Sequence, residues 1–384
     1  MAFRKRNVAV GTTASVLPAN SAPTPSSNQP GIRPSPLTSH SVTSTGTPSL
    51  DDLLGGHTGL ALGSSLLIEE SGTTDFAGAL LRFYAAEGVC HGHVVHVVGV
   101  GEGWVRELPG VAEGRSSGRR AASAAGGAEE KMKIAWRYEK LGQAGERALP
   151  DRGATSASTP ASQPQQPFCH TFDLSKRLTP PENAPINHIP IRPSPRPFDP
   201  ILQALTHALK SSPPSTIHRV VIPTLLSPAL YPPQASRPEN VLQFLHALRA
   251  LLHQYPTRLT AMLTLPLELH PRTTALVRWL ELLASGVLEL TPFPHLLNSA
   301  PATETTGASG AKEQLQGMLK AHKLPLATER SEGGAGAGNS IGEDLAFTVS
   351  RRKFVIEPFA LPPVEGDQDA QAEGGGLTGR AVEF

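Results

Sequence analysis

The stretch with the clearest chemical potential is residues 62–77, LGSSLLIEESGTTDFA. It has the pattern of a phosphate-binding loop: a short apolar strand, a turn that contains glycine, and a helix whose first backbone N–H groups can hold phosphate oxygens. Such a loop normally carries a lysine, whose charge reaches the β- and γ-phosphates of a nucleotide. The pattern therefore raises the question of nucleotide binding.

The turn lacks that lysine. The candidate nucleotide loop consists of Glu70, Ser71, Gly72, Thr73 and Thr74. Glu69 and Asp75 flank it, and no lysine occurs between Lys5 and Lys131, so no small shift of the alignment restores the positive charge. Three carboxylates without a lysine would repel a triphosphate. We therefore expect a degenerate phosphate-binding loop.

A second part of the usual nucleotide machinery is also missing. Nucleotide-hydrolysing domains of this kind hold Mg²⁺ with a carboxylate at the end of a later strand. The best candidate for that strand is residues 219–222, and the next residue is Pro223, which has no carboxylate. We expect no catalytic residues, and no nucleotide or other cofactor bound by this chain alone.

The sequence gives little support for other catalytic sites or for metal sites. His91, His93 and His96 are close in sequence, but residues 91 and 93 share one face of a strand and residue 96 lies on the other. We expect them to pack or to cap, and we expect no metal site. The pattern G-x-S-x-G occurs at residues 114–118 and 338–342, but both lie in low-complexity stretches and not between a strand and a helix, so we expect no nucleophile elbow. The two cysteines exclude a disulfide scaffold and favour a reducing compartment.

Basic and aromatic residues alternate in residues 131–140 and again in 351–354. Such residues can neutralise phosphates and stack on unpaired bases, as structured RNA requires. Trp136 and Tyr138 also fit a half-buried strand, and residues 351–354 also fit a charged strand edge, so both interpretations stay open. The net charge is only +1, so any nucleic-acid surface must be local.

Strands alternate with helices along the ordered part of the chain. The predicted strands are 64–68, 93–100, 218–226, 259–265 and 287–290, and the predicted helices are 73–87, 237–254 and 271–285. This alternation predicts βαβ units around a mainly parallel sheet. A short helix capped by Thr47 or Ser49 should precede them. Residues 317–325 and 344–359 predict two strands of an antiparallel hairpin near the C-terminus.

The 37 prolines and 36 glycines indicate that much of the chain is linker. We predict a disordered region at 1–45, an ordered domain at 46–362 and a flexible tail at 363–384. Low-complexity insertions are predicted within the domain at 111–128, 142–166, 301–312 and 329–341. No run of about 18 apolar residues predicts a membrane span. The basic residues 4–6 fit a nuclear address or an ordinary charged end.

Several sequence blocks resemble a known family. The order TGTPSLDDLLGG, then LGSSLLIEESGTTDFAGALLRFYAAEG, is similar to the opening of RecA-like ATPase domains of the RadA and KaiC type. The closer resemblance is to the family of the fourth Elongator subunit, and it extends from residue 31 to about 362. The blocks that carry it are RPSPLTS, STGTPSLDDLLGG, SSLLIEESGTTDFAGALLRFYAAEGV, KIAWRYE, LKAHKLP and EDLAFTVSRRKFVIEPF.

The resemblance implies an α/β, RecA-like (P-loop NTPase-type) three-layer domain with a degenerate loop. It also implies that the chain assembles with Elongator subunits five and six, two copies of each, into an accessory hetero-hexameric ring. That ring would bind tRNA and support formation of 5-carboxymethyl-type side chains on the wobble uridine (U34), with the chemistry in another subunit. ATP would lie at interfaces between ring subunits, and the location would be the cytoplasm and the nucleus.

RecA-like rings direct the loops after their central strands towards the pore, which makes Arg237 in the loop 227–238 a candidate tRNA contact. Lys133 and Arg137, in the first basic and aromatic segment, are the other candidates. Two alternatives remain: an active RecA- or KaiC-type ATPase or translocase on nucleic acid, which the missing lysine and Pro223 disfavour, and a purely structural scaffold subunit.

Overall fold

The computed structural model describes residues 29–38, 40–54, 58–112, 167–181, 183–294, 315–325 and 345–359. Lys133, Arg137, the insertions at 142–166, 301–312 and 329–341 and the tail at 363–384 lie outside the described residues, as does most of the insertion at 111–128. No helix in these ranges is long and apolar enough to cross a membrane.

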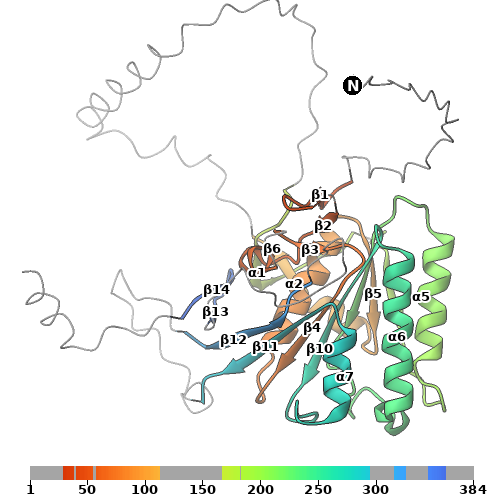
Figure 1. Cartoon of the computed structure of the whole chain (residues 1–384). Helices are drawn as coiled ribbons and strands as arrows, with labels where there is room; N and C mark the ends of the chain where they lie inside the picture. Colours follow the sequence, from red (N-terminus) through yellow and green to blue (C-terminus); the bar gives the residue numbers. More distant parts are fainter. Residues whose placement is uncertain are drawn as a thin grey trace, which may run out of the picture.

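A central sheet organises the described residues (Figure 1). Its strands run in the order β14-β13-β12-β11-β4-β10-β9-β5-β8. The six from β11 to β8 pair in parallel, and β12 to β14 add antiparallel pairs at one edge. The parallel strands are β4 (Ser65–Glu70), β5 (Val94–Val98), β8 (Ile186–Ile189), β9 (His218–Ile222), β10 (Leu259–Pro266) and β11 (Gly286–Pro292). The mainly parallel sheet predicted from the sequence is confirmed.

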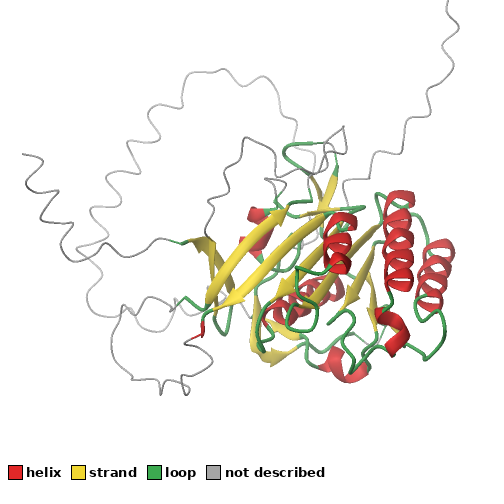
Figure 2. Ribbon diagram, turned by 60° about the horizontal axis from the view of Figure 1, so that its bottom comes forward, coloured by secondary structure: helices red, strands yellow, loops and turns green. Residues whose placement is uncertain are grey.

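Helices cover both faces of this sheet (Figures 1 and 2). One face carries α2 (Phe76–Cys90), and the other carries α5 (Asp199–Ser211), α6 (Pro238–Gln254) and α7 (Ala275–Leu283). Alternate residues of a strand point to opposite faces, so Leu66 and Ile68 join the core under α2 whereas Leu67 joins the core under α5 to α7. The three-layer α/β arrangement is therefore confirmed.

The N-terminal part is more ordered than its composition predicts. β1 (Ile32–Pro34) and β2 (Ser41–Thr43) form an antiparallel sheet with β3 (Leu60–Ala61), so disorder over 1–45 is wrong for these strands. The sequence does not predict these strands because each has only two or three residues, too few for an alternating apolar pattern. The helix α1 (Pro48–Leu53) has Thr47 at its N-cap position, as one of the two predictions had it, but the Thr47 side chain makes no cap bond; Ser49 lies within the helix and donates to the Phe354 carbonyl.

The C-terminal edge also differs from the predicted hairpin. Residues 344–359 were predicted as one strand, but they hold two, β13 (Leu345–Val349) and β14 (Phe354–Pro358). The Ser350 N–H donates to the Lys353 carbonyl and closes the turn between them. β12 (Gly317–Lys323) pairs with both β11 and β13, so the antiparallel edge has three strands.

Two elements of the main sheet layers were not predicted. The edge strand β8 and the helix α5 flank the proline-rich segment 190–200, whose composition masks them. A smaller sheet pairs β6 (Pro109–Val111) with β7 (Phe172–Arg177), and α3 (Glu102–Arg106) and a short 3-10 helix η2 (Pro233–Ser236) complete the described elements. β6 therefore includes Val111, the first residue of a predicted insertion.

Candidate functional site

The candidate nucleotide loop lies where the central strand β4 leads into α2. The strand ends at Glu70 and the helix begins at Phe76, so the predicted strand, turn and helix are present, with a helix start three residues later than predicted. β4 lies between β10 and β11 in the parallel part of the sheet. This position presents the first backbone N–H groups of α2 beyond the carboxyl edge of the sheet.

The first amides of α2 already have an anionic partner within the chain. Glu70 Oε1 accepts hydrogen bonds from the Phe76 N–H at 2.9 Å and the Thr74 hydroxyl at 2.7 Å. Glu70 Oε2 accepts from the Ala77 N–H at 2.9 Å. Free amides at a helix N-terminus are the groups that bind phosphate. A carboxylate of the chain itself therefore fills the place of a phosphate group.

A second carboxylate binds the glycine of the loop. The Gly72 N–H donates to Glu268 Oε1 at 2.9 Å. Gly72 has a φ of 85°, in the left-handed region that favours glycine, which explains this residue at the tip of the turn. We call the loop with Glu70 and Glu268 bound to its amides the self-filled phosphate loop. Ser71 donates its N–H to the Leu290 carbonyl, and Thr73 is exposed.

The electrostatics of this loop disfavour a second anion. Burial raises the pKa of Glu70, although the hydrogen bonds from Thr74, Ala77 and Phe76 lower it in part. Asp75 adds another carboxylate next to the loop, and its nearest described cation is Arg82, whose Nη1 lies 2.8 Å from Asp75 Oδ2. A nucleotide would therefore have to displace one carboxylate and approach others without a lysine.

The position expected to hold Mg²⁺ carries hydroxyl groups instead. β9 ends at Ile222, and Pro223 leads to Thr224, whose N–H donates to Thr264 Oγ1 at 2.7 Å. Thr224 and Thr264 line a recess together with Glu70 and Gly72. Neither threonine supplies the charge that binds Mg²⁺ in nucleotide-hydrolysing sites. The end of β9 therefore lies where a Mg²⁺-binding carboxylate is expected, but it carries no carboxylate.

The other predicted contact within the described residues is Arg237. It is exposed and occupies the N-cap position of α6, at the end of the loop that follows β9. Its carbonyl accepts from the Asn240 and Val241 N–H groups, which are in the first turn of the helix. Lys133 and Arg137 lie outside the described residues, so the structure places only Arg237 of the three candidates.

The three histidines considered as metal ligands do not share one site. His96 Nε2 lies 2.9 Å from His218 Nδ1, whereas His93 accepts from Arg219 and lies 3.0 Å from the Pro30 carbonyl. Burial and, to a smaller extent, the neighbouring His218 lower the pKa of His96 to about 3. His91 instead contacts Glu87. These histidines are therefore buried partners of other polar groups.

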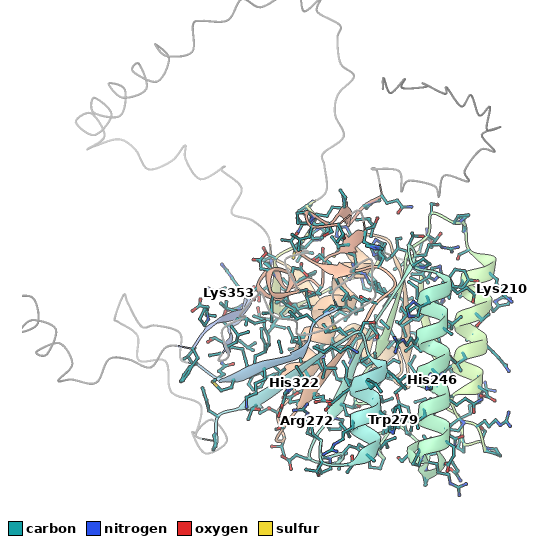
Figure 3. The ribbon with its side chains drawn as sticks, viewed as in Figure 1. Lys210, His246, Arg272, Trp279, His322 and Lys353 are labelled. Atoms are coloured by element: carbon teal, nitrogen blue, oxygen red, sulfur yellow. The ribbon has the colours of Figure 1, made fainter. Side chains whose placement is uncertain are left out.

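The sequence analysis missed a charged cluster around Arg272 (Figure 3). Arg272 Nε lies 2.8 Å from Glu281 and 3.1 Å from Glu69 Oε2, and its Nη1 lies 3.1 Å from Glu289. His322 Nε2 lies 2.7 Å from the same Glu289 oxygen. The pairing of strand positions 69 and 289 in β4 and β11 could have indicated it, but only after the register was known.

The family of this chain is identified by its similarity to known proteins. The PAXNEB protein family matches residues 25–381. The chain belongs to this family. Elongator complex protein 4 of Schizosaccharomyces pombe is 34% identical over 88% of the chain and 90% of that protein. Its namesake in Saccharomyces cerevisiae is 29% identical over 90% of the chain and 79% of that protein. Elongator complex protein 4 of Xenopus laevis is 30% identical over 92% of the chain and 87% of that protein.

These relatives confirm the family that the sequence blocks resemble. A solved KaiC-like protein from Pyrococcus horikoshii OT3 is also similar, with 15% identity and a TM-score of 0.40 over 83% of this chain and 99% of its own. That likeness is too distant to carry an argument. The α/β class rests on the sheet order and layers described above, and the place in Elongator rests on the relatives.

Replacement of Glu70 by Ala is expected to destabilise the self-filled phosphate loop. Two helical amides would lose their acceptor, as on loss of a helix cap, which costs about 1 kcal/mol of the free energy of unfolding. Urea denaturation would measure the change, and Thr73→Ala, on the exposed residue of the same loop, is the matched control. Equal midpoints for the two variants would show that Glu70 does not hold the helix end.

Proposed function

We propose that this chain is a non-catalytic, RecA-like subunit of an accessory hetero-hexameric ring that it forms with Elongator subunits five and six. The ring binds and positions tRNA and supports the 5-carboxymethyl-type modification of the wobble uridine (U34) by another Elongator subunit. Membership of the PAXNEB family and the similarity to Elongator complex protein 4 support the place in Elongator. The proposed locations are the cytoplasm and the nucleus.

The observation that carries the non-catalytic role is the self-filled phosphate loop. Glu70 and Glu268 occupy amides that a nucleotide would need. The strand, turn and helix are retained because they pack α2 against the sheet, where eleven of its residues are buried. ATP in the ring is therefore proposed to lie at interfaces between subunits, held by residues of the partners.

An exposed apolar surface supports assembly with partner subunits. Trp279 and Leu282 lie three residues apart on α7, with 49% and 57% of their surface exposed, and Leu269 before the helix is 50% exposed. Figure 3 shows Trp279 on the outer side of this helix. Exposed large apolar side chains with a tryptophan are typical of interface centres. We assign this α7 surface to a contact within the ring.

The proposal is tested by assembly followed by RNA binding. The full chain is mixed with Elongator subunits five and six, and native mass spectrometry is expected to find two copies of each subunit. Trp279→Ser should weaken that assembly, whereas His246→Ser on the exposed side of α6 should not. A hexamer that shifts tRNA in a gel supports the proposal. A chain that hydrolyses ATP alone, with the activity lost on Thr74→Ala, would support an active ATPase.

Replacement of Lys133, Arg137 and Arg237 by Ala is expected to weaken tRNA binding by the assembled ring about tenfold, because each would lose a phosphate contact. The slope of log affinity against log salt should fall by about 3. Replacement of Lys210, Arg106 and Arg177, which are exposed on α5, α3 and β7, is the control of equal charge. A hexamer that does not bind tRNA at all would instead favour the structural scaffold.

A further inference from the structure

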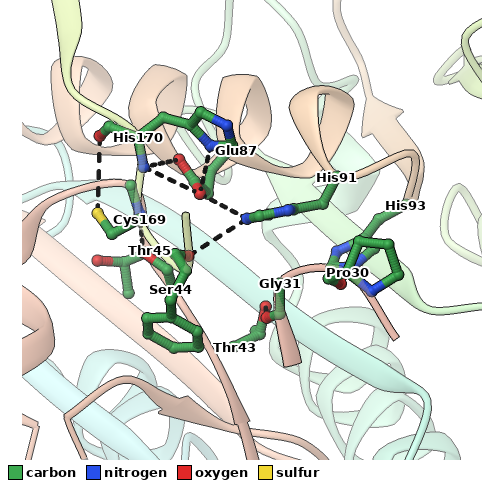
Figure 4. A network of polar contacts seen from close by, with 12 residues as sticks. Pro30, Gly31, Thr43, Ser44, Thr45, Glu87, His91, His93, Cys169 and His170 are labelled. Carbon is green, nitrogen blue, oxygen red and sulfur yellow. Dashed lines mark hydrogen bonds and ion pairs between the residues drawn. The ribbon is translucent and has the colours of Figure 1, made fainter. Parts of the chain in front are cut away.

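Three side chains that the phosphate loop does not use meet at the far end of α2. Glu87 and His91 are four residues apart at the C-terminus of this helix, so they share one face of it. His170 reaches them from the segment that enters β7. Figure 4 shows the three side chains directed toward one another. One oxygen of Glu87 and one ring nitrogen from each histidine all lie within 4.8 Å of each other.

We propose that Glu87, His91 and His170 form a binding site for one Zn²⁺ ion. Two imidazole nitrogens and one carboxylate oxygen are ligands that zinc takes in proteins, with a fourth position for water or another oxygen. The site joins the end of α2 to the segment before β7, two parts of the chain that are 79 positions apart between His91 and His170. Its role is structural, since it fixes the β6 and β7 sheet to the domain.

The distances allow this coordination with small movements. Glu87 Oε1 lies 2.7 Å from His91 Nε2 and 3.0 Å from His170 Nδ1. Zinc bonds of about 2.0–2.2 Å in a tetrahedron separate neighbouring donors by about 3.4 Å. Each pair would therefore open by about half an ångström. The Phe168 carbonyl, 3.2 Å from His91 Nε2, is a further oxygen within reach of the fourth position.

The surrounding chain holds the ligands in place. A Cβ on Gly31 would lie 2.4 Å from Cδ2 of His91, so the glycine lets the backbone press on this ring. The His170 N–H donates to both Glu87 oxygens, at 3.1 and 3.3 Å, which orients the carboxylate from a second element. Ligands positioned by packing and by hydrogen bonds to neighbouring groups are a property of metal sites.

The nearby cation Arg219 does not donate a hydrogen bond to Glu87. Glu87 is fully buried, and Arg219 donates to His93, to the carbonyls of Ser44 and Tyr84 and to Thr43, although its charge also interacts with Glu87. The hydrogen-bond partners of the Glu87 carboxylate are therefore His91 and His170. Cys169 stays outside the ligand set, because its thiol donates to the His170 carbonyl at 3.6 Å. The His170 side chain is 14% exposed, which gives an ion a route from solvent.

The test uses the full chain after chelator treatment and dialysis. Calorimetric titration with Zn²⁺ is expected to show one equivalent bound with a submicromolar Kd. His170→Gln should weaken this binding at least about 100-fold, as loss of a ligand does. His207→Gln, on the exposed side of α5, should leave it unchanged. Circular dichroism of both variants confirms that they are folded.

A measurement on the unmutated chain tests the zinc site even if a variant does not fold. X-ray absorption at the zinc edge is expected to show two imidazoles, oxygen ligands and no sulfur. Sulfur in the shell, or equal Zn²⁺ affinity for wild type and His170→Gln, would overturn the site. So would the absence of a bound equivalent, and Glu87, His91 and His170 would then be a hydrogen-bonded network only.

Discussion

Replacement of Arg219 by Met is expected to lower the free energy of unfolding by about 4 kcal/mol, the largest effect of any single change proposed here. Arg219 is fully buried in β9. Its nitrogens donate to His93 Nδ1 at 3.0 Å, to the carbonyls of Ser44 and Tyr84 at 2.9 Å, and to Thr43 Oγ1 at 2.7 Å. Met fills a similar volume but cannot donate a hydrogen bond to any of these four acceptors.

The size of this loss follows from what Arg219 connects. Its partners come from the N-terminal strand β2, from α2 and from the start of β5, so one side chain joins the small sheet to the domain. Its charge also lowers the free energy of the buried carboxylates Asp51 and Glu87. Breaking a buried charged network by removing one partner costs several kcal/mol, against a total of about 5–15 kcal/mol for a domain.

Urea denaturation at pH 7 measures the change. Arg278→Met, on the exposed side of α7, is the matched control and should shift stability by less than about 0.5 kcal/mol. The double variant with Glu87→Gln should recover part of the loss if the unpaired charge contributes to it. A loss below about 1 kcal/mol in the single variant would contradict the role given to Arg219.

Replacement of Glu69 by Gln is expected to remove a pH-dependent penalty of about 2 kcal/mol. The pKa of Glu69 is raised from 4.5 to about 8, because burial and, to a smaller extent, the charges of Glu281 and Glu289 outweigh the opposing effect of Arg272. Arg272 Nε lies 3.1 Å from Glu69 Oε2, but its N–H points to Glu281, and neither Glu69 oxygen accepts a hydrogen bond within the described residues.

The direction of the pH effect follows from this raised pKa. The folded chain holds the Glu69 proton more tightly than the unfolded chain, so its contribution to stability is fully present below pH 4.5 and is lost as pH rises through about 8. The effect is about 2 kcal/mol, because solvent reaches Arg272 and screens the charges of the cluster. Wild type should therefore lose stability between pH 5 and pH 8.5 relative to the Gln variant.

Denaturation of wild type and Glu69→Gln at both pH values would measure the difference. Glu239→Gln, on an exposed carboxylate in the first turn of α6, is the control and should follow wild type within about 0.5 kcal/mol. Parallel pH profiles for wild type and Glu69→Gln would show that Glu69 is ionised in the folded chain, and that Arg272 compensates it.

The sequence predicts the long elements of the fold well because their periodicity is strong. The helix predicted at 237–254 is α6 almost to the residue, and the strands around 259–265 and 287–290 are β10 and β11. The strands β1 and β2 were missed because two- or three-residue strands have no measurable period. The hairpin of β13 and β14 was missed because its turn contains charged residues and no glycine or proline.

The candidate site was predictable in part. The missing lysine and Pro223 can be read directly from the sequence, and they indicate a degenerate loop. That Glu70 turns back onto the amides of Phe76 and Ala77 could not be read, because the rotamer of one side chain depends on the packing around it. Glu87, His91 and His170 likewise meet only through tertiary structure, since 79 positions separate the two histidines.

Glu70 belongs to the same chain as the helix N-terminus whose N–H groups it binds. A free anion must therefore compete for these N–H groups with a carboxylate whose effective concentration is about millimolar or higher. The proposed function implies that the geometry around α2 is set when the chain folds and does not depend on nucleotide. In the proposed ring, this subunit would keep a constant shape while the subunits that hold ATP change theirs.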